Sequence, residues 1–444
     1  MNYLSPARAF ILFTAAITWS SCITQGPSGI FGRKSPHDDY GDKLKNAGLS
    51  ETALGRRWFA AAGQSLLKPV SVNIPYKETG YFAAAEPRAV GLTFGARRGE
   101  KLTISLNKDP SAGFAIYVDL WEPAIDGDAT PKFLLAADTL LSPLTFEVEK
   151  NGNYILRLQP ELLKGGDYTV TITTGPSLAF PVTPKVKSNI GSFWGVDRDA
   201  GARRHEGIDI FAPRGTALVA AAEGEVTRVN ENTLGGKVVF LNPTNKPYTL
   251  YYAHLQEQLV QPGQHVKVGD TIGLVGNTGN ARSTLPHLHF GIYTSSGAVD
   301  PLPFVNNVLK AVDKISAPLV NLNKLVRTNK QTQLFSAPSF KSKPAIIEAN
   351  ILLKVEAATV DWYKVCLPGG ESGFVASRDV TAGKEPIRKI NLKDSQPLLD
   401  EPTSVAATKT TLAKGQRVGV IAAYKDFYYV ASNNEEGWIY KEGL

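Results

Sequence analysis

Short runs of alternating apolar and polar residues, separated by turns rich in glycine and proline, recur from residue 68 to the end of the chain. Leu102–Leu106 and Tyr168–Ile172 are two of these runs. Because successive side chains of a strand point to opposite faces, such runs predict strands with one buried face. The 40 glycines and 28 prolines supply the turns, and long helical periodicity is scarce. The sequence therefore predicts a mainly β chain, whose 444 residues suffice for several domains.

The N-terminal segment predicts export. Arg8 precedes an apolar run at residues 9–17, which is too short to span a bilayer and is typical of a secretory signal. Cys22 follows small residues, and this junction resembles the lipobox of bacterial lipoproteins, in which the cysteine carries lipid. Residues 1–22 are thus predicted to be a signal peptide, and a lipid on Cys22 would anchor the chain to the periplasmic face of the outer membrane. Simple cleavage nearby, which would give a soluble periplasmic or secreted protein, is the alternative.

Between residues 23 and 182, a change in composition and patterning predicts two regions. Residues 23–42 are polar and predict a flexible tether, which an amphipathic helix follows, so that tether and helix together occupy residues 23–67. Residues 68–182 contain several alternating runs and predict an antiparallel β-sandwich. Two of these runs begin with Gly-x-Tyr and resemble the non-catalytic pre-peptidase domains of secreted bacterial hydrolases. No catalytic cluster occurs there, whereas residues 183–312 hold the features that carry chemistry.

The C-terminal part contains an approximate internal repeat. Asp361–Val365 recurs as Asp426–Val430, and each copy is followed by a glycine and two apolar residues. A repeat of about 60 residues is too long for common solenoids and suits two small barrels in tandem. These barrels are predicted at residues 326–383 and 384–444. The pattern resembles bacterial SH3-like modules, which accompany wall hydrolases; two structural barrels that bind nothing are the alternative.

Three histidine-bearing segments follow one another within the central domain. His205 and Asp209 are four residues apart in a segment that alternates like a strand, so both side chains can face one side. In the last of the three segments, His287 and His289 share one face. The middle segment, Leu250–Leu255, predicts another strand, which places His254 beside the end of a sheet. Imidazole nitrogens and carboxylate oxygens are ordinary ligands of Zn²⁺. Two imidazoles side by side above an apolar strand seldom serve packing, because unpaired buried histidines are costly.

In this order the three segments resemble the lysostaphin-type zinc metallopeptidases, over residues 190–301. The resemblance implies a catalytic zinc with three protein ligands and an open fourth position for water. It also implies two non-ligand histidines, of which one accepts a proton and the other stabilises the oxyanion. Which histidine has which role does not follow from the sequence. The implied ligands are His205, Asp209 and His289, and the implied pair is His254 and His287.

One glycine-rich loop, residues 273–280, flanks the predicted groove. It lacks the Lys-Ser/Thr pair of a phosphate-binding loop, and no helical pattern follows it. Just before the first histidine, Arg203 and Arg204 either attract a carboxylate of a substrate peptide or lie on a solvated surface. The candidate substrate contacts are Asn277, Thr278, Asn280 and Tyr252.

Export, the SH3-like repeats and the resemblance together imply a zinc-dependent endopeptidase that cleaves peptide cross-links or stem peptides of peptidoglycan. Residue chemistry alone would allow any exposed peptide bond. The alternatives are a catalytically silent wall-binding regulator of another hydrolase and a zinc protease that acts on secreted proteins. The net charge of +7 is dispersed, and no Lys/Arg-rich run or aromatic-basic motif occurs, so no nucleic-acid partner is expected. The sequence does not indicate an oligomeric state.

Overall fold

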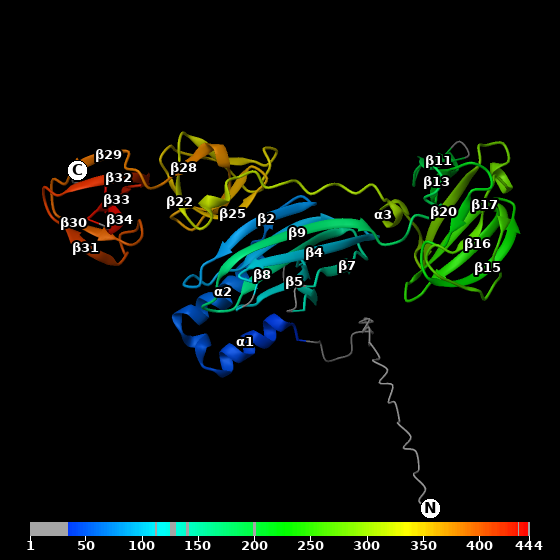
Figure 1. Cartoon of the computed structure of the whole chain (residues 1–444), viewed down its shortest axis with the longest axis horizontal. Coiled ribbons are helices and arrows are strands. Elements are labelled where there is room, and N and C mark those ends of the chain that lie inside the picture. The colour runs from blue at the N-terminus through cyan, green and yellow to red at the C-terminus, as the bar shows by residue number, and fades with distance from the viewer. Residues whose placement is uncertain are drawn as a thin grey trace, which may run out of the picture. The chain divides into compact units, whose positions relative to one another are not determined.

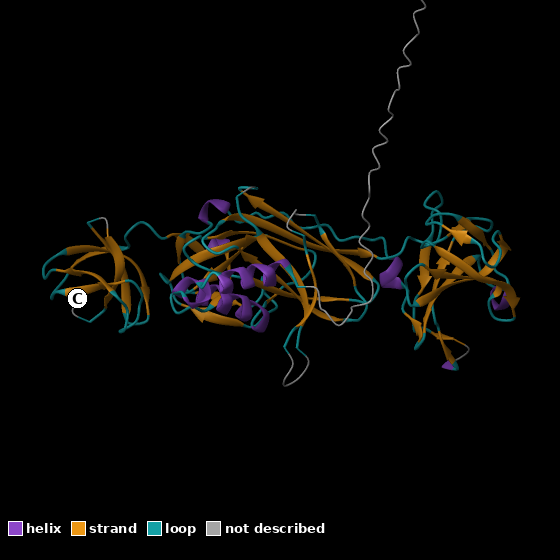
Figure 2. Cartoon of the chain, turned by 90° about the horizontal axis from the view of Figure 1, so that it is seen from below, coloured by secondary structure: helices purple, strands orange, loops and turns teal. Residues whose placement is uncertain are grey.

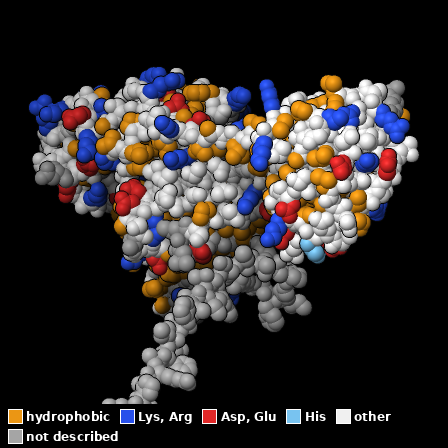
Figure 3. All heavy atoms as spheres, turned by 45° about the vertical axis from the view of Figure 1, so that its right-hand side comes forward, with side chains coloured by type: hydrophobic (Ala, Val, Ile, Leu, Met, Phe, Trp, Pro, Cys, Tyr) orange, Lys and Arg blue, Asp and Glu red, His pale blue; other side chains and the backbone are white. Residues whose placement is uncertain are grey.

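The computed structural model is built mainly of strands, in agreement with the mainly β prediction (Figure 2). The described residues are 34–111, 113–124, 130–138, 142–198, 201–433 and 435–442. The predicted signal peptide, Cys22 and most of the predicted tether lie outside them. No helix among the described residues is long and apolar enough to cross a membrane. On the face seen in Figure 3, Lys and Arg side chains are scattered among other side chains.

The end of the predicted tether is helical. Helix α1 (Pro36–Asn46) begins at Ser35, whose hydroxyl accepts a hydrogen bond from the backbone N–H of Asp38 in a capping box. His37 is 5% exposed, stacks on Trp58 of helix α2 (Ala53–Leu67) and lies 2.6 Å from the amide oxygen of Gln159. Residues 36–42 were therefore wrongly predicted to be a tether, because capping and burial against distant residues give this polar segment a fixed conformation.

Two sheets follow and share one apolar core, which contains Leu92, Leu102, Leu156 and Ile172. All their pairings are antiparallel except the short pair β1–β3. The sequence predicted an antiparallel β-sandwich for this part of the chain, and the structure has antiparallel sheets there. The first sheet has the order β1 (Val70–Ser71), β3 (Val90–Ala96), β8 (Gly152–Pro160), β5 (Ile116–Glu122) and β6 (Lys132–Ala136), and the second contains β2 (Tyr76–Phe82), β9 (Gly166–Pro176), β4 (Glu100–Asp109) and β7 (Leu144–Glu147).

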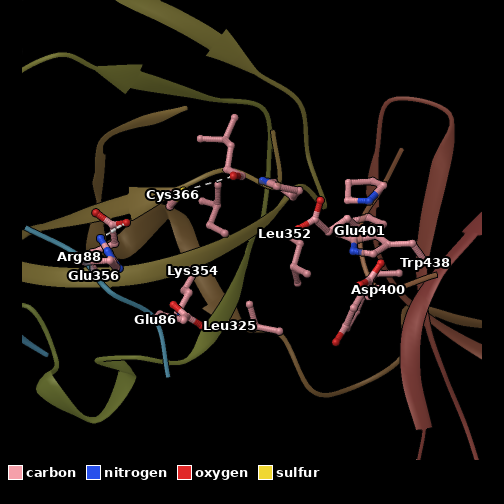
Figure 4. Close-up of a pocket in the computed structure, with 15 residues that line it drawn as sticks. Glu86, Arg88, Leu325, Leu352, Lys354, Glu356, Cys366, Asp400, Glu401 and Trp438 are labelled. Carbon is pink, nitrogen blue, oxygen red and sulfur yellow. Dashed lines mark hydrogen bonds and ion pairs between the residues drawn. The ribbon is translucent and has the colours of Figure 1, made fainter. Parts of the chain in front are cut away.

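The second sheet continues into the C-terminal repeats, which the sequence did not indicate. Strand β2 pairs with β25 (Leu352–Thr359). Two ion pairs flank this pairing: Arg88 with the buried Glu356, and Glu86 with Lys354 at 2.6 Å (Figure 4). A sandwich strand and a repeat strand thus belong to one hydrogen-bonded sheet.

Each C-terminal repeat forms an antiparallel meander of three strands, β25–β26–β27 in the first and β32–β33–β34 in the second. The repeated aromatic residues lie on β26 and β33, as the sequence comparison of the two copies predicts. The remaining strands of the first repeat are β22 (Leu325–Thr328), β23 (Thr332–Phe335), β24 (Pro344–Ile347), β26 (Trp362–Cys366), β27 (Ser372–Ala376) and β28 (Val380–Ala382). Those of the second are β29 (Arg388–Asn391), β30 (Gln396–Leu399), β31 (Thr408–Leu412), β32 (Arg417–Tyr424), β33 (Phe427–Ser432) and β34 (Glu435–Tyr440).

The histidine-bearing part is a ten-stranded sheet with its own core (Figure 1). Strands β10, β13, β20 and β17 are neighbours in that order, and the three pairings between them are antiparallel. The main path is β10 (Asn189–Ser192), β13 (Ile208–Phe211), β20 (His287–Thr294), β17 (Tyr248–Gln258), β16 (Gly236–Pro243), β15 (Gly224–Asn232) and β18 (His265–Val266), with β14 (Ala217–Val219), β19 (Thr271–Val275) and β21 (Gly297–Val299) off this path. A separate two-stranded ribbon is formed by β11 (Asp197–Arg198) and β12 (Arg203–Arg204), and the short helix α3 (Leu302–Val305) follows the sheet.

Candidate active site

Strand register brings the predicted ligands together. In the antiparallel pair β13–β20, Asp209 lies directly opposite His289, and on the other side of β20 His289 lies opposite Ala253 of β17. The alternate residues Ile208 and Leu288 are fully buried in the core on the far face. Because side chains alternate along a strand, core packing of one face turns the other face of β13 and β20, with its polar side chains, toward a common groove.

Three donor atoms then meet in a nearly equilateral triangle. The distances from His205 Nε2 to Asp209 Oδ1, from His205 Nε2 to His289 Nδ1, and from His289 Nδ1 to Asp209 Oδ1 are each 3.0 Å. Zinc bonds of about 2.0–2.2 Å in tetrahedral geometry require ligand atoms roughly 3.3–3.5 Å apart. The triangle therefore fits one zinc ion after a shift of a few tenths of an ångström. Among the described residues, these three are the one group of His, Cys, Asp or Glu with such spacing.

Neighbouring groups orient two of the three candidate ligands, His205 and Asp209. The Nδ1 of His205 lies 2.8 Å from the backbone carbonyl of Phe193, so Nδ1 donates there and Nε2 keeps its lone pair for a metal. Asp209 Oδ2 accepts a hydrogen bond from Arg198 at 2.5 Å, which leaves Oδ1 for the metal. Arg198 also donates to Ser192 on the strand next to β13. Nothing in the sequence indicated Arg198 or the Phe193 carbonyl, because a carbonyl has no sequence signature and the arginine reaches Asp209 only through the fold.

The two non-ligand histidines are held in the same way. His254 Nδ1 lies 2.9 Å from the carbonyl of Thr278, and His287 Nδ1 lies 2.8 Å from the carbonyl of Leu285. Donation from Nδ1 leaves the lone pair of each ring on Nε2, on the opposite side of the ring. The two rings are 5.0 Å apart, and His287 Nε2 is 4.0 Å from Asp209 Oδ1.

The backbone of His254 is unusual. Its φ of +63° lies in the left-handed region, which non-glycine residues enter rarely and at some energetic cost, and often at functional sites. The bend coincides with a register shift against β16 between Tyr252 and Leu255, and a second shift, against β19, follows between Leu255 and Glu257. Burial, together with the neighbouring His287 and His289, lowers the pKa of His254 to about 4, so the ring is neutral at neutral pH.

The three candidate ligands and the two further histidines line one pocket of about 390 Å³. Of the candidate substrate contacts, Asn280 lines this pocket. Asn277 and Thr278 are outside its lining; their side chains instead hydrogen-bond the carbonyls of Thr284 and Leu255 and so hold the loop. The other lining residues include Tyr251, Tyr293, Leu234, Ala281, Thr284 and the three arginines Arg198, Arg203 and Arg204.

Tyr252 does not fit its predicted role as a substrate contact. The side chain is fully buried in the core, and its hydroxyl accepts a hydrogen bond from the backbone N–H of Ala221 at 2.9 Å. Its neighbour Tyr251 lines the pocket instead. The alternation of β17 carries the signal that could have identified this, because Tyr252 shares a face with the core residue Leu250.

Gly207 gives a first testable prediction. A Cβ atom at this position would lie 2.5 Å from the carbonyl oxygen of Phe290 and 2.7 Å from Cε1 of His289. We expect Gly207→Ala to push His289 away from the other two ligands and to weaken zinc binding by about 10–100-fold, as the loss of a ligand's supporting contact does. Competition with a chromophoric chelator measures this change. Gly63→Ala, which adds the same methyl group where nothing lies within 4 Å, is the matched control. Equal zinc affinity of both variants and the parent protein would disprove the steric argument.

Comparison with known proteins adds the family. Residues 203–301 match peptidase family M23. The chain is 43% identical over 88 residues to the peptidoglycan DD-endopeptidase ShyC of Vibrio cholerae, covering 20% of each protein. It is 36% identical over 137 residues to the L-Ala--D-Glu endopeptidase of Bacillus subtilis, covering 28% of this chain and 42% of that protein. The solved catalytic domain of lysostaphin from Staphylococcus simulans is 31% identical, with a TM-score of 0.25, over 27% of this chain and 92% of that domain.

The matched region thus amounts to between a fifth and about two fifths of the length of the two curated relatives. It contains all three strands that form the groove and all three donor residues of the triangle. Residues 203–301 form a domain of peptidase family M23, with His205, Asp209 and His289 as its candidate metal site.

Proposed function

We propose that the chain is a zinc-dependent endopeptidase that hydrolyses peptide cross-links or stem peptides of bacterial peptidoglycan. The observation that carries the proposal is the triangle of donor atoms 3.0 Å apart, with two further histidines held beside it in the same groove. A purely structural cluster would not need three ligand atoms turned toward one point and two more imidazoles whose Nδ1 atoms are already occupied.

In the proposed reaction, three residues bind the metal and two histidines act on the water and the substrate. His205, Asp209 and His289 would hold the metal, and a bound Zn²⁺ would act as a Lewis acid on an amide carbonyl and acidify a water molecule. In our proposal, His254 and His287 act at Nε2. One of them takes a proton from the attacking water on the lone pair of its Nε2. The other donates a hydrogen bond to the oxygen that becomes negative, and for this it must carry a proton on Nε2 as well as on Nδ1. Their Nδ1 contacts to backbone carbonyls fix the ring orientation in advance, which removes an ordering cost from the reaction.

The names of the relatives support peptidoglycan as the substrate, since one is a peptidoglycan DD-endopeptidase and another an L-Ala--D-Glu endopeptidase. The two C-terminal repeats, which we propose to be SH3-like modules, would bind the wall. We also propose a non-catalytic role for the β-sandwich of residues 68–182. A signal peptide ending at a lipidated Cys22 would place the enzyme on the periplasmic face of the outer membrane.

Digestion of purified sacculi tests the proposal. We expect the zinc-loaded full chain to release muropeptides that have lost a peptide bond, and a zinc chelator to stop the release until zinc is added back. Mass spectrometry of the products identifies the cleaved bond. Intact sacculi after incubation with folded protein that carries one zinc per chain would refute the endopeptidase and favour a regulator of another hydrolase.

A further inference from the structure

The groove is flanked by unlike sides. The strands of the sheet follow one another in the order β13–β20–β17–β16. The segment that precedes β13 carries three arginines, and the turn that precedes β16, at the other end of this order, carries Leu234. Pocket residues on the second side include Leu234, Gly235 and Ala281, which are uncharged. The first side carries Arg198, Arg203 and Arg204, all of which line the same pocket as the metal ligands.

The three arginines are not equivalent. Arg198 is committed to Asp209 and Ser192. Arg204, next in sequence to the ligand His205, is exposed and makes no ion pair with any described residue, although Asp197 lies opposite it in the ribbon. The acids of the lining are Asp209, which is one of the three donor residues, and Glu206, which accepts a hydrogen bond from the hydroxyl of Tyr293 at 3.5 Å. Among the described residues of the lining, three arginines therefore stand beside two acids, even before a divalent metal is counted.

An arginine at such a position suits a carboxylate. Its planar guanidinium presents paired N–H donors that match the two oxygens of a carboxylate, and the bond gains strength beside other positive charges. We propose that Arg204, supported by Arg203 on the ribbon β11–β12, binds a carboxylate of the substrate next to the cleaved bond. The site would then select acidic stem peptides over peptides of the same length without side-chain carboxylates. This inference rests on the proposed function and specifies the substrate class of that same site.

Because the charged side lies beyond His205 and the neutral side beyond His254, the substrate would also bind in one direction. Its carboxylate would lie over β12, and the uncharged part of the peptide would lie along Leu234 and Ala281. Specificity would thus come from a contact made equally before and during the reaction, which lowers KM without changing kcat.

The test uses a cross-linked stem peptide dimer with free carboxylates and the same dimer with these carboxylates amidated. We expect the zinc-loaded full chain to prefer the acidic dimer by about tenfold in kcat/KM, through KM. Arg204→Gln should remove most of this preference with kcat nearly unchanged, and Arg204→Lys should keep part of it. Arg228→Gln, which removes an exposed arginine from the same domain outside the pocket lining, should change neither value.

Binding supplies a readout independent of turnover. Fluorescence anisotropy of the labelled acidic dimer with chelator-treated full chain should weaken with added salt, and the salt dependence should be smaller for Arg204→Gln. Equal cleavage of both dimers by the parent protein, or an Arg204→Gln variant that loses kcat and keeps its preference, would overturn the inference alone. Failure to cleave either dimer or sacculi would overturn the proposed function as well.

Discussion

Asp209→Ala is expected to leave the protein unable to hold stoichiometric zinc and without peptidase activity. The carboxylate contributes one of three donor atoms through Oδ1 and anchors Arg198 through Oδ2. Its removal deletes a ligand and leaves a guanidinium without its anionic partner beside two histidines. The loss of metal affinity should therefore exceed the roughly 10–100-fold that follows the loss of an outer partner. Metal analysis of the dialysed protein and a sacculus assay measure the two effects.

Two further variants test whether the negative charge of Asp209 is needed for zinc binding. Asp209→Asn keeps an oxygen at the same place but no negative charge, so zinc binding should fall with the fold intact. Asp270→Asn changes an exposed carboxylate of the same domain, which only accepts a hydrogen bond from the backbone of Lys267, and should keep both zinc and activity. One zinc per chain and full activity in Asp209→Ala would show that the triangle is not the metal site.

Replacement of His254 or His287 by alanine should lower kcat by about 10²–10⁴-fold, the usual contribution of a positioned acid, base or oxyanion donor. Zinc content should stay at the level of the parent protein, because neither ring belongs to the triangle of donor atoms. This combination of lost turnover and retained metal distinguishes the pair from the ligands. Kinetics on a soluble stem peptide dimer, with metal analysis of the same samples, provide the measurement.

The double variant sharpens this prediction. If the two histidines act together on one reaction, the loss in His254→Ala/His287→Ala should be far smaller than the product of the single losses. His265→Ala, which removes an exposed histidine of the same domain, should have no effect. A single variant that loses its zinc, or that keeps the kcat of the parent protein, would contradict the assignment of roles.

Strand β17 differs from its sequence-based prediction in one backbone conformation and one side chain. The sequence correctly predicted a strand here, but alternation alone would place His254 on the core face with Tyr252. His254 lies in the groove where the register with β16 shifts and the backbone is left-handed, and no glycine or asparagine marks that position. The same alternation, followed strictly, assigns Tyr252 to the core and Tyr251 to the groove, as the structure has them. The candidate contact Tyr252 was therefore an error of interpretation and not a lack of signal.

The sequence by itself determined the mainly β class, the internal repeat and the five histidine and aspartate residues of the groove. These features depend on residue type and on local spacing. For His287 and His289, both on β20, the two-residue period of a strand converts this spacing directly into a shared face. Only the tertiary structure decided which groups hydrogen-bond to those residues. Arg198 donates to Asp209, and the backbone carbonyls of Phe193, Thr278 and Leu285 accept from His205, His254 and His287, respectively. The tertiary structure also decided that β2 pairs with β25, far away in the chain. Such contacts depend on strand register and loop path, which follow from how a whole core packs, and no short segment of sequence contains that information.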